Sequence, residues 1–217
     1  MQEYKAMSQA GRSMIEMLGV LAIVGVLSIG AIAGYSKAFY KFKINRTMED
    51  LSSFVANVKE KFANVPSYTN LDSKLAYNLA LFTDDMVKHC ESISDVANIN
   101  PSSSEETSGG DKIVVSTVNS IGTTCLSSWL GGGVAISANS DGNSFAIAFD
   151  KVSKEACVTL ANQEWDNNSG FDSLTVTAGG SDQVKVLRNM DKGTAVNSMA
   201  KCNSCGGGDC IAVWTFL

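Results

Sequence analysis

The stretch that decides the fold, MIEMLGVLAIVGVLSIGAIA, runs from Met14 to Ala33. Its twenty residues contain a single charged side chain, that of Glu16. A helix of this length spans roughly 30 Å at about 1.5 Å per residue, which matches the hydrocarbon layer of a bilayer. The sequence therefore predicts a membrane helix that carries one carboxylate near its start.

Two interpretations of Glu16 follow from the residues alone. Near the start of the helix, its carboxylate would reach the lipid headgroups, where an acid also suits the positive end of the helix dipole. Alternatively, the carboxylate has a function and a cationic partner, because a charge at the bilayer centre costs about 2.5–3.5 kcal/mol and ionisable groups in membrane helices are usually paired.

The charge of the chain is unevenly distributed. The net charge is −5, but six basic residues face three acidic ones between Tyr35 and Lys61. Beyond Lys61, seventeen acidic residues face nine basic ones. This asymmetry favours packing of the basic segment against an acidic head or against phospholipid, and it argues against a nucleic-acid partner.

The cysteines indicate the compartment. More basic residues follow the apolar run than precede it, so the positive-inside rule predicts a cytoplasmic C-terminal part. However, an even number of cysteines beyond the anchor is typical of an oxidising compartment, which argues for the opposite orientation. The six are Cys90, Cys125, Cys157, Cys202, Cys205 and Cys210.

The first helix is expected to continue far beyond the membrane, from about Arg12 to Ala63. After residue 34, apolar residues recur mostly at spacings of three and four, which indicates one amphipathic stripe. Pro66 is the first strong stop signal. The stripe consists of Phe39, Phe42, Met48, Leu51, Val55, Val58 and Phe62.

The remaining residues fit one α+β domain with its own core. Helical spacing predicts helices within 71–86, 153–162 and 194–201, with Ser153 as a helix cap. Segments rich in Val, Ile and Phe predict strands at 112–118, 134–138, 144–149, 174–177, 184–187 and 211–216. Residues 98–110, rich in Ser and Gly, are expected to form a loop.

The start of the apolar run closely resembles the class III signal of type IV prepilins. The residues that carry the resemblance are Gly11, the four residues that follow it, Glu16 and the apolar helix. The resemblance implies that prepilin peptidase cuts between Gly11 and Arg12, and that Arg12 is then N-methylated. The family usually has Phe, Met or Leu where this chain has Arg12.

The same resemblance implies roles for two further residues. In that family the glutamate pairs with the new N-terminal amine of a neighbouring subunit, so Glu16 is expected to act in assembly. Gly25 stands where the family has a glycine that begins a segment able to melt in the filament, which implies local helix flexibility. The proline that usually follows eight residues later is Ala33 here.

The C-terminal region is similar to that of type IVb pilins, although the eleven-residue leader is shorter than is usual there. The similarity lies in residues 155–160, Trp165, a helix that ends at Cys202 and the aromatic segment 213–216. It implies a disulfide from Cys157 to Cys202, Cys205 or Cys210, and we expect Cys90 to pair with Cys125. Spacing alone leaves fifteen pairings open.

Other chemistry finds little support in the sequence. Cys202, Cys205 and Cys210, with His89 or Cys157, would supply four zinc ligands, but a second Cys-x-x-Cys is missing. A redox role for Cys202 and Cys205 is disfavoured because no strand precedes the pair at a helix start. The glycine runs at 131–133 and 206–208 lack the spacing of a phosphate loop and predict turns. The tryptophans Trp129, Trp165 and Trp214 are expected in the core.

The predicted organisation comprises a leader at 1–11, an N-terminal helix at 12–65 and a globular head at 66–217. Within the helix, residues 14–33 would form the membrane or filament core, and residues 34–65 an amphipathic stalk. The expected fold is the α+β type IV pilin fold, in which the long helix packs on an antiparallel sheet and the C-terminal region is disulfide-bonded.

The resemblance implies a structural subunit that polymerises into a type IV pilus, with no enzymatic activity, cofactor or metal. Its expected partners are copies of itself, prepilin peptidase, the inner-membrane assembly platform and, before assembly, the membrane. It would reside in a bacterial inner membrane and then in an extracellular pilus. The alternatives are a minor pilin, a type II secretion pseudopilin in a periplasmic pseudopilus, and a membrane-anchored periplasmic binding protein that does not polymerise.

Overall fold

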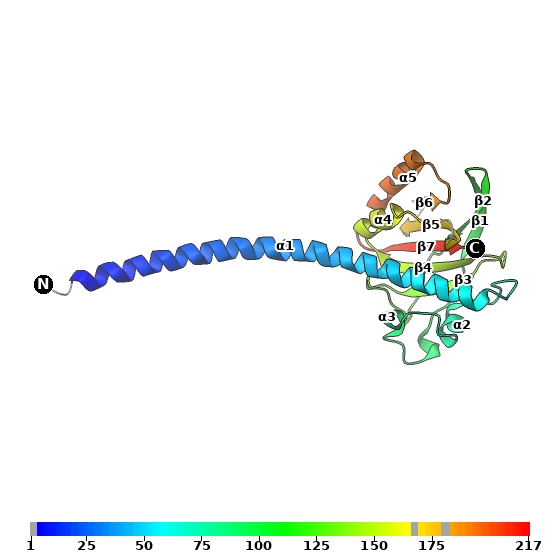
Figure 1. The fold of residues 1–217 in the computed structure, drawn as a ribbon, viewed down its shortest axis with the longest axis horizontal. Helices are drawn as coiled ribbons and strands as arrows, with labels where there is room; N and C mark the ends of the chain where they lie inside the picture. The colour runs from blue at the N-terminus through cyan, green and yellow to red at the C-terminus, as the bar shows by residue number, and fades with distance from the viewer. Residues whose placement is uncertain (1–3, 166–168, 179–182) are drawn as a thin grey trace. The chain divides into compact units, whose positions relative to one another are not determined.

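The structure is a computed structural model that describes residues 4–165, 169–178 and 183–217, without the side chains of residues 4–13 and 33. The chain divides into two compact units, Met1–Lys43 and Ile44–Leu217, and each is described by itself. Helix α1 (Tyr4–Phe62) contributes to both units, whereas the other described helices and strands belong to the second (Figure 1).

Helix α1 is continuous from Tyr4 to Phe62. It therefore starts before Arg12, where the sequence analysis placed its beginning. The segment before Arg12 contains Lys, Ala, Met and Gln, which have high helix propensity, and it lacks proline. The end of the helix, four residues before Pro66, agrees with the predicted stop.

Residues 44–62 of α1 form part of the core of the second unit. Ile44, Leu51, Phe54 and Val58 are at most 2% exposed, and their spacing places them on one face of the helix. The compact unit therefore starts at Ile44, earlier than the head expected from residue 66. Burial of these side chains makes this half of the helix part of the globular unit, because each contributes about 1.5–3 kcal/mol when it leaves water.

An antiparallel five-stranded sheet with the order β3-β4-β7-β5-β6 forms the centre of the second unit (Figure 1). The last strand lies in the middle, and every residue of it is buried. All five strands were predicted, with ends that shift by up to three residues. They are β3 (Val134–Ala138), β4 (Phe145–Val152), β5 (Phe171–Ala178), β6 (Gln183–Leu187) and β7 (Cys210–Phe216).

A separate hairpin pairs β1 (Ser102–Ser108) with β2 (Asp111–Thr117). The loop predicted for residues 98–110 was wrong over β1. This strand is polar and mostly exposed, so it lacks the alternation that identifies a half-buried strand. Its stability comes from backbone pairing with β2, whose predicted position is confirmed, and Gly109 and Gly110 make the turn with positive φ angles of 57° and 92°.

The single helix predicted for residues 71–86 is two short helices, α2 (Ser73–Asn78) and α3 (Asp84–Val87). The chain leaves the helix at Ala80, whose φ is +52°, and this turn buries Leu81 and Phe82. The ring of Phe82 stacks on that of Phe54 at 4.7 Å between centroids. Tertiary packing against α1 therefore overrides the helical spacing of this segment.

The remaining helices lie close to their predicted positions. Helix α4 (Lys154–Ala161) starts at Ser153, whose hydroxyl accepts a hydrogen bond from the Ala156 amide at 3.3 Å. Helix α5 (Lys192–Met199) continues into the 3-10 helix η3 (Ala200–Cys205), and a further 3-10 turn, η1, covers Ile93–Asp95. The Ser153 cap was thus identified correctly from the sequence.

Candidate functional site

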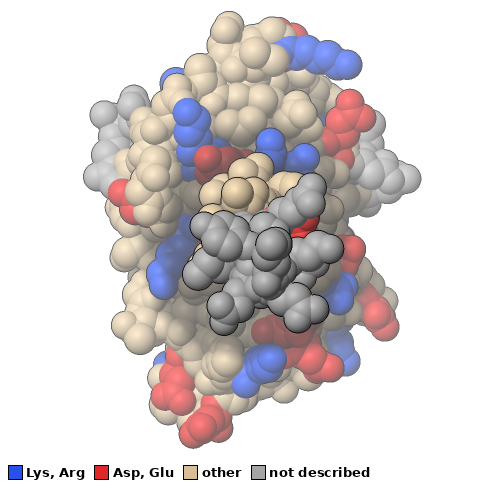
Figure 2. Space-filling view, turned by 90° about the vertical axis from the view of Figure 1, so that its left-hand side faces the viewer, with Lys and Arg blue, Asp and Glu red and all other residues tan. Residues whose placement is uncertain are grey.

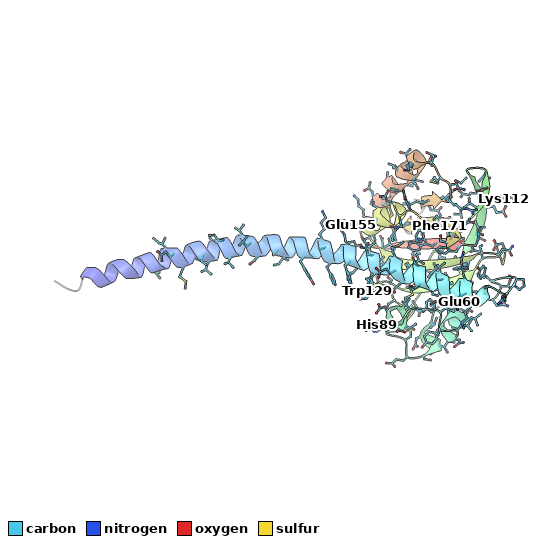
Figure 3. All side chains as sticks on the ribbon, viewed as in Figure 1. Glu60, His89, Lys112, Trp129, Glu155 and Phe171 are labelled. Carbon is cyan, nitrogen blue, oxygen red and sulfur yellow. A yellow bond between two sulfur atoms is a disulfide. The ribbon has the colours of Figure 1, made fainter. Side chains whose placement is uncertain are left out.

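The apolar surface of α1 in the first unit is the candidate site. The large apolar side chains between Met14 and Ile32 are between 52% and 73% exposed. Figure 3 shows side chains that project from this part of the helix both above and below the ribbon. Among the described residues, α1 alone is long and apolar enough to cross a membrane, with a mean hydropathy of 2.4 in its most apolar window.

Glu16 lies within this apolar surface. Its side chain is exposed, and its immediate neighbours Ile15 and Met17 are 73% and 66% exposed. No other acidic residue occurs between positions 17 and 48. Among the described side chains, none forms an ion pair with Glu16.

Two hydroxyl groups in and just beyond the apolar stretch bond to the backbone of their own helix. Ser28 donates to the carbonyl oxygen of Val24 at 2.7 Å, and Ser36 donates to that of Ile32 at 3.0 Å. These bonds satisfy both hydroxyls without water, as an apolar environment requires. The Ser28 and Ser36 side chains are therefore compatible with hydrocarbon.

Gly25 lies inside the continuous helix, and a Cβ atom at this position would meet no atom within 4 Å. The same holds for Gly30 and Gly34. The four residues on either side of Gly25 are helical as well. Local melting at Gly25 stays a prediction about an assembled state.

The predicted cleavage site lies in the first part of α1. The backbone of Gly11 and Arg12 is helical, whereas their side chains are outside the described ones. Cleavage between these residues and methylation of Arg12 therefore stay predictions from the sequence.

Directly after the apolar stretch, aromatic and basic residues alternate in a segment that we call the aromatic–basic band, residues 35–43. The rings of Tyr35 and Phe39 are 5.8 Å apart, and those of Phe39 and Phe42 are 6.2 Å apart, both nearly parallel. The ammonium of Lys43 lies 5.3 Å from the Phe39 ring centroid, within cation–π range. The basic charge of this segment was evident from the sequence, whereas the aromatic stack was not predicted, although the spacing 35, 39, 42 places the three rings on one side of a helix.

Three disulfides link the six cysteines, all of them in the second unit. Cys90 pairs with Cys125, as expected. Cys157 in α4 pairs with Cys202 in η3, which selects one of the three partners that the resemblance had left open. The third disulfide, Cys205–Cys210, closes the glycine turn directly before β7.

The disulfides leave no thiolates for the alternative zinc site, because the sulfurs that it required are bonded to one another. His89 is exposed in the short segment after α3 (Figure 3). The described residues contain no group of three His, Cys, Asp or Glu side chains that could hold a metal ion.

The glycine runs form turns, as predicted. At Gly132 a Cβ atom would lie 2.1 Å from the carbonyl oxygen of Asp150, so only glycine fits this close approach. Gly131 and Gly208 have positive φ angles of 87° and 70°.

The tryptophans differ in burial. Trp214 on β7 is fully buried and packs edge-on against Phe149 and Trp165. Trp165 and Trp129 are partly buried. The core position predicted for Trp214 is confirmed, whereas the other two lie at the margin of the core.

The face drawn in Figure 2 carries acidic and basic side chains that are interspersed. Together, the long apolar helix, the antiparallel sheet and the disulfides form an α+β layout of the kind expected from the sequence. A comparison with protein-family models found no match, and a comparison with curated proteins found none either.

Proposed function

We propose that the chain is a pilin, a structural subunit that polymerises into a type IV pilus after prepilin peptidase removes residues 1–11. The observation that carries this proposal is the exposed apolar helix from Met14 to Ile32, interrupted by the single carboxylate of Glu16.

The apolar surface needs a cover. A Val, Leu, Ile or Met side chain is less stable by about 1.5–3 kcal/mol in water than when buried, and this helix exposes many of them. A bilayer covers all sides of such a helix before assembly, because the apolar stretch matches the hydrocarbon thickness of roughly 30 Å. In a filament, the same surfaces of neighbouring copies would cover one another.

Glu16 distinguishes a filament subunit from a simple anchor. A carboxylate inside hydrocarbon costs a plain anchor free energy, whereas a filament subunit can pair it with a cationic group of a neighbouring copy. After cleavage at Gly11, the new α-amine of Arg12 on an adjoining copy would supply a positive partner. Two unit charges at 4 Å attract by about 4 kcal/mol at an effective dielectric constant of 20, against a desolvation cost of several kcal/mol per ion. The pair would therefore fix the register of neighbouring helices more than it would stabilise them.

The disulfides support the expected orientation. Three disulfides in the unit that follows the helix suit an oxidising compartment outside the cytoplasm. The precursor would then be stored in the inner membrane with its head outside, where the inner-membrane assembly platform extracts it into the fibre.

The test compares fibre formation by the variant Glu16→Gln with that of a matched control, Glu60→Gln. Both residues lie exposed on α1, and both changes keep the side-chain shape while they remove one negative charge. We expect E16Q to remain in the membrane fraction with three disulfides but to form no fibres visible by electron microscopy. E60Q should form fibres at the wild-type level.

Intact fibres from E16Q would contradict the proposal and favour a membrane-anchored periplasmic binding protein. Fibres that depend on Glu16 but contain this chain only in trace amounts would favour a minor pilin. Short fibres confined to the periplasm would favour a secretion pseudopilin.

A further inference from the structure

We infer that the aromatic–basic band binds anionic phospholipid headgroups in the membrane leaflet at the C-terminal end of the apolar stretch. This inference deepens the proposed function, because it rests on a precursor stored in the membrane. It assigns a lipid partner to residues 35–43, which the polymerisation proposal leaves unused.

The length of the apolar stretch places the band at the membrane surface. The 21 residues from Met14 to Gly34 span about 31 Å at 1.5 Å per residue, close to the hydrocarbon thickness of roughly 30 Å. Tyr35 therefore lies at the level of the headgroups. Tyr35, Phe39 and Phe42 are 68%, 42% and 46% exposed. Tyrosine is enriched at membrane interfaces, where its ring meets the headgroups.

The charge of the band is complementary to an anionic surface. Lys37, Lys41 and Lys43 fall within nine residues, and the chain has no acidic residue between positions 17 and 48. Lys37 and Lys41 are exposed, and long basic side chains next to a membrane helix extend along its surface towards the headgroups. Each lysine close to an anionic membrane favours binding by roughly five-fold.

The arrangement around the helix favours lipid over a protein partner. At about 100° per residue, the three rings share one side of the helix, and Lys43 lies next to them over Phe39. Lys37 and Lys41 lie on roughly the opposite side. A protein would contact one side, whereas headgroups surround a helix that crosses the bilayer surface and so meet the lysines on both sides.

The test measures which lipid lies next to the band in the full-length chain. The variant Phe39→Trp adds a tryptophan reporter, and the chain without it supplies the background from the native tryptophans. The protein is reconstituted into phosphatidylcholine vesicles that contain brominated phosphatidylcholine or brominated phosphatidylglycerol. Quenching by the two brominated lipids gives the preference for the anionic one.

Two triple variants of F39W separate local from general charge effects. K37Q/K41Q/K43Q removes the lysines of the band, and K154Q/K192Q/K201Q removes three exposed lysines of the second unit. We expect the parent and the second variant to prefer phosphatidylglycerol by several-fold. The band variant should show a preference close to one, as should the parent in 1 M salt.

Equal quenching by the two lipids in the parent would overturn the inference, and so would a preference that survives in the band variant. If the band variant keeps the lipid preference of the parent but forms no fibres, the lysines instead contact another copy of the chain. Absence of quenching by either lipid would also overturn the inference, because the band would then lie away from the lipid. Sedimentation of the chain with the vesicles distinguishes that outcome from failure of the membrane-stored precursor, in which the chain would not sediment with them.

Discussion

Asp172 is a carboxylate on β5 that is only 1% exposed. Its Oδ2 accepts a hydrogen bond from the Val114 amide at 2.8 Å, and its Oδ1 lies 3.3 Å from Nη2 of Arg188. The position therefore links β5 to β2 and to the residue that follows β6. Burial raises the pKa of Asp172 above its ordinary value, although the Val114 amide and Arg188 oppose this shift.

The raised pKa makes a prediction about the pH dependence of stability. The unfolded chain ionises first as the pH rises, so Asp172 contributes most below its unfolded pKa and loses this contribution as the pH rises through its folded pKa. The variant Asp172→Asn does not ionise here. Its free energy of unfolding relative to wild type should therefore increase from about pH 3 upwards, measured by urea unfolding with tryptophan fluorescence in detergent.

Arg188 supplies the matched comparison for this residue. Arg188→Gln removes the charge that lowers the pKa of Asp172, while its backbone amide can still donate to the Asp172 carbonyl. R188Q should lose stability more steeply than wild type over the same pH range. If the free energy of unfolding changed with pH in the same way for wild type, D172N and R188Q, the raised pKa of Asp172 and the opposing effect of Arg188 would be contradicted.

Ser153 caps α4, and its hydroxyl accepts from the Ala156 amide. Ser153→Ala should lower the free energy of unfolding by about 1 kcal/mol, because it leaves a helix N–H group without this partner. Ser153→Asp keeps an acceptor and should retain most of the stability. A loss of the same size in both variants, measured by urea unfolding, would mean that the hydroxyl has another role.

At the scale of elements, the disulfides differ in the chain length that they enclose. Cys157–Cys202 spans 45 residues and joins α4 to η3, whereas Cys205–Cys210 spans five. The loop-entropy relation gives about 4 kcal/mol for the first and about 2 kcal/mol for the second. The double variant C157A/C202A should therefore lose about twice as much stability as C205A/C210A in urea unfolding.

Both pairs of cysteines are almost fully buried, at 2% exposure or less, so the cavities left by the two alanine variants are comparable. Equal losses would indicate that packing, rather than the length of the closed loop, sets the contribution of each disulfide. A larger loss in C205A/C210A would contradict the prediction and would point to the turn before β7 as the more important constraint.

Elements with their own local signal were predictable from the sequence. The apolar strands β3, β4 and β7 and the Ser153 cap have such signals, since burial and capping depend on residue type. Strand β1 has none, because its Ser and Glu residues are held by pairing with β2. The break between α2 and α3 depends on the contact of Phe82 with Phe54 in α1, which the local sequence does not contain.

At the scale of the whole chain, only part of the candidate site could be predicted from the sequence. The apolar run and Glu16 are evident because a single charge in twenty apolar residues stands out. The spacing of Tyr35, Phe39 and Phe42 indicates that their rings share one side of α1, but the contacts between the rings depend on rotamers and required the structure. The start of the compact unit at Ile44 likewise depends on which side chains of α1 the sheet and short helices bury.

The central claim is that copies of this chain, cut after Gly11, pack through their apolar helices with Glu16 next to a new amine. The most direct test is the intact mass of the subunit isolated from surface fibres. We predict a chain that begins at Arg12 with a methylated α-amine and three disulfides. A fibre subunit that begins at Met1 would contradict this account, because the amine would then lie eleven residues from the position that Glu16 requires.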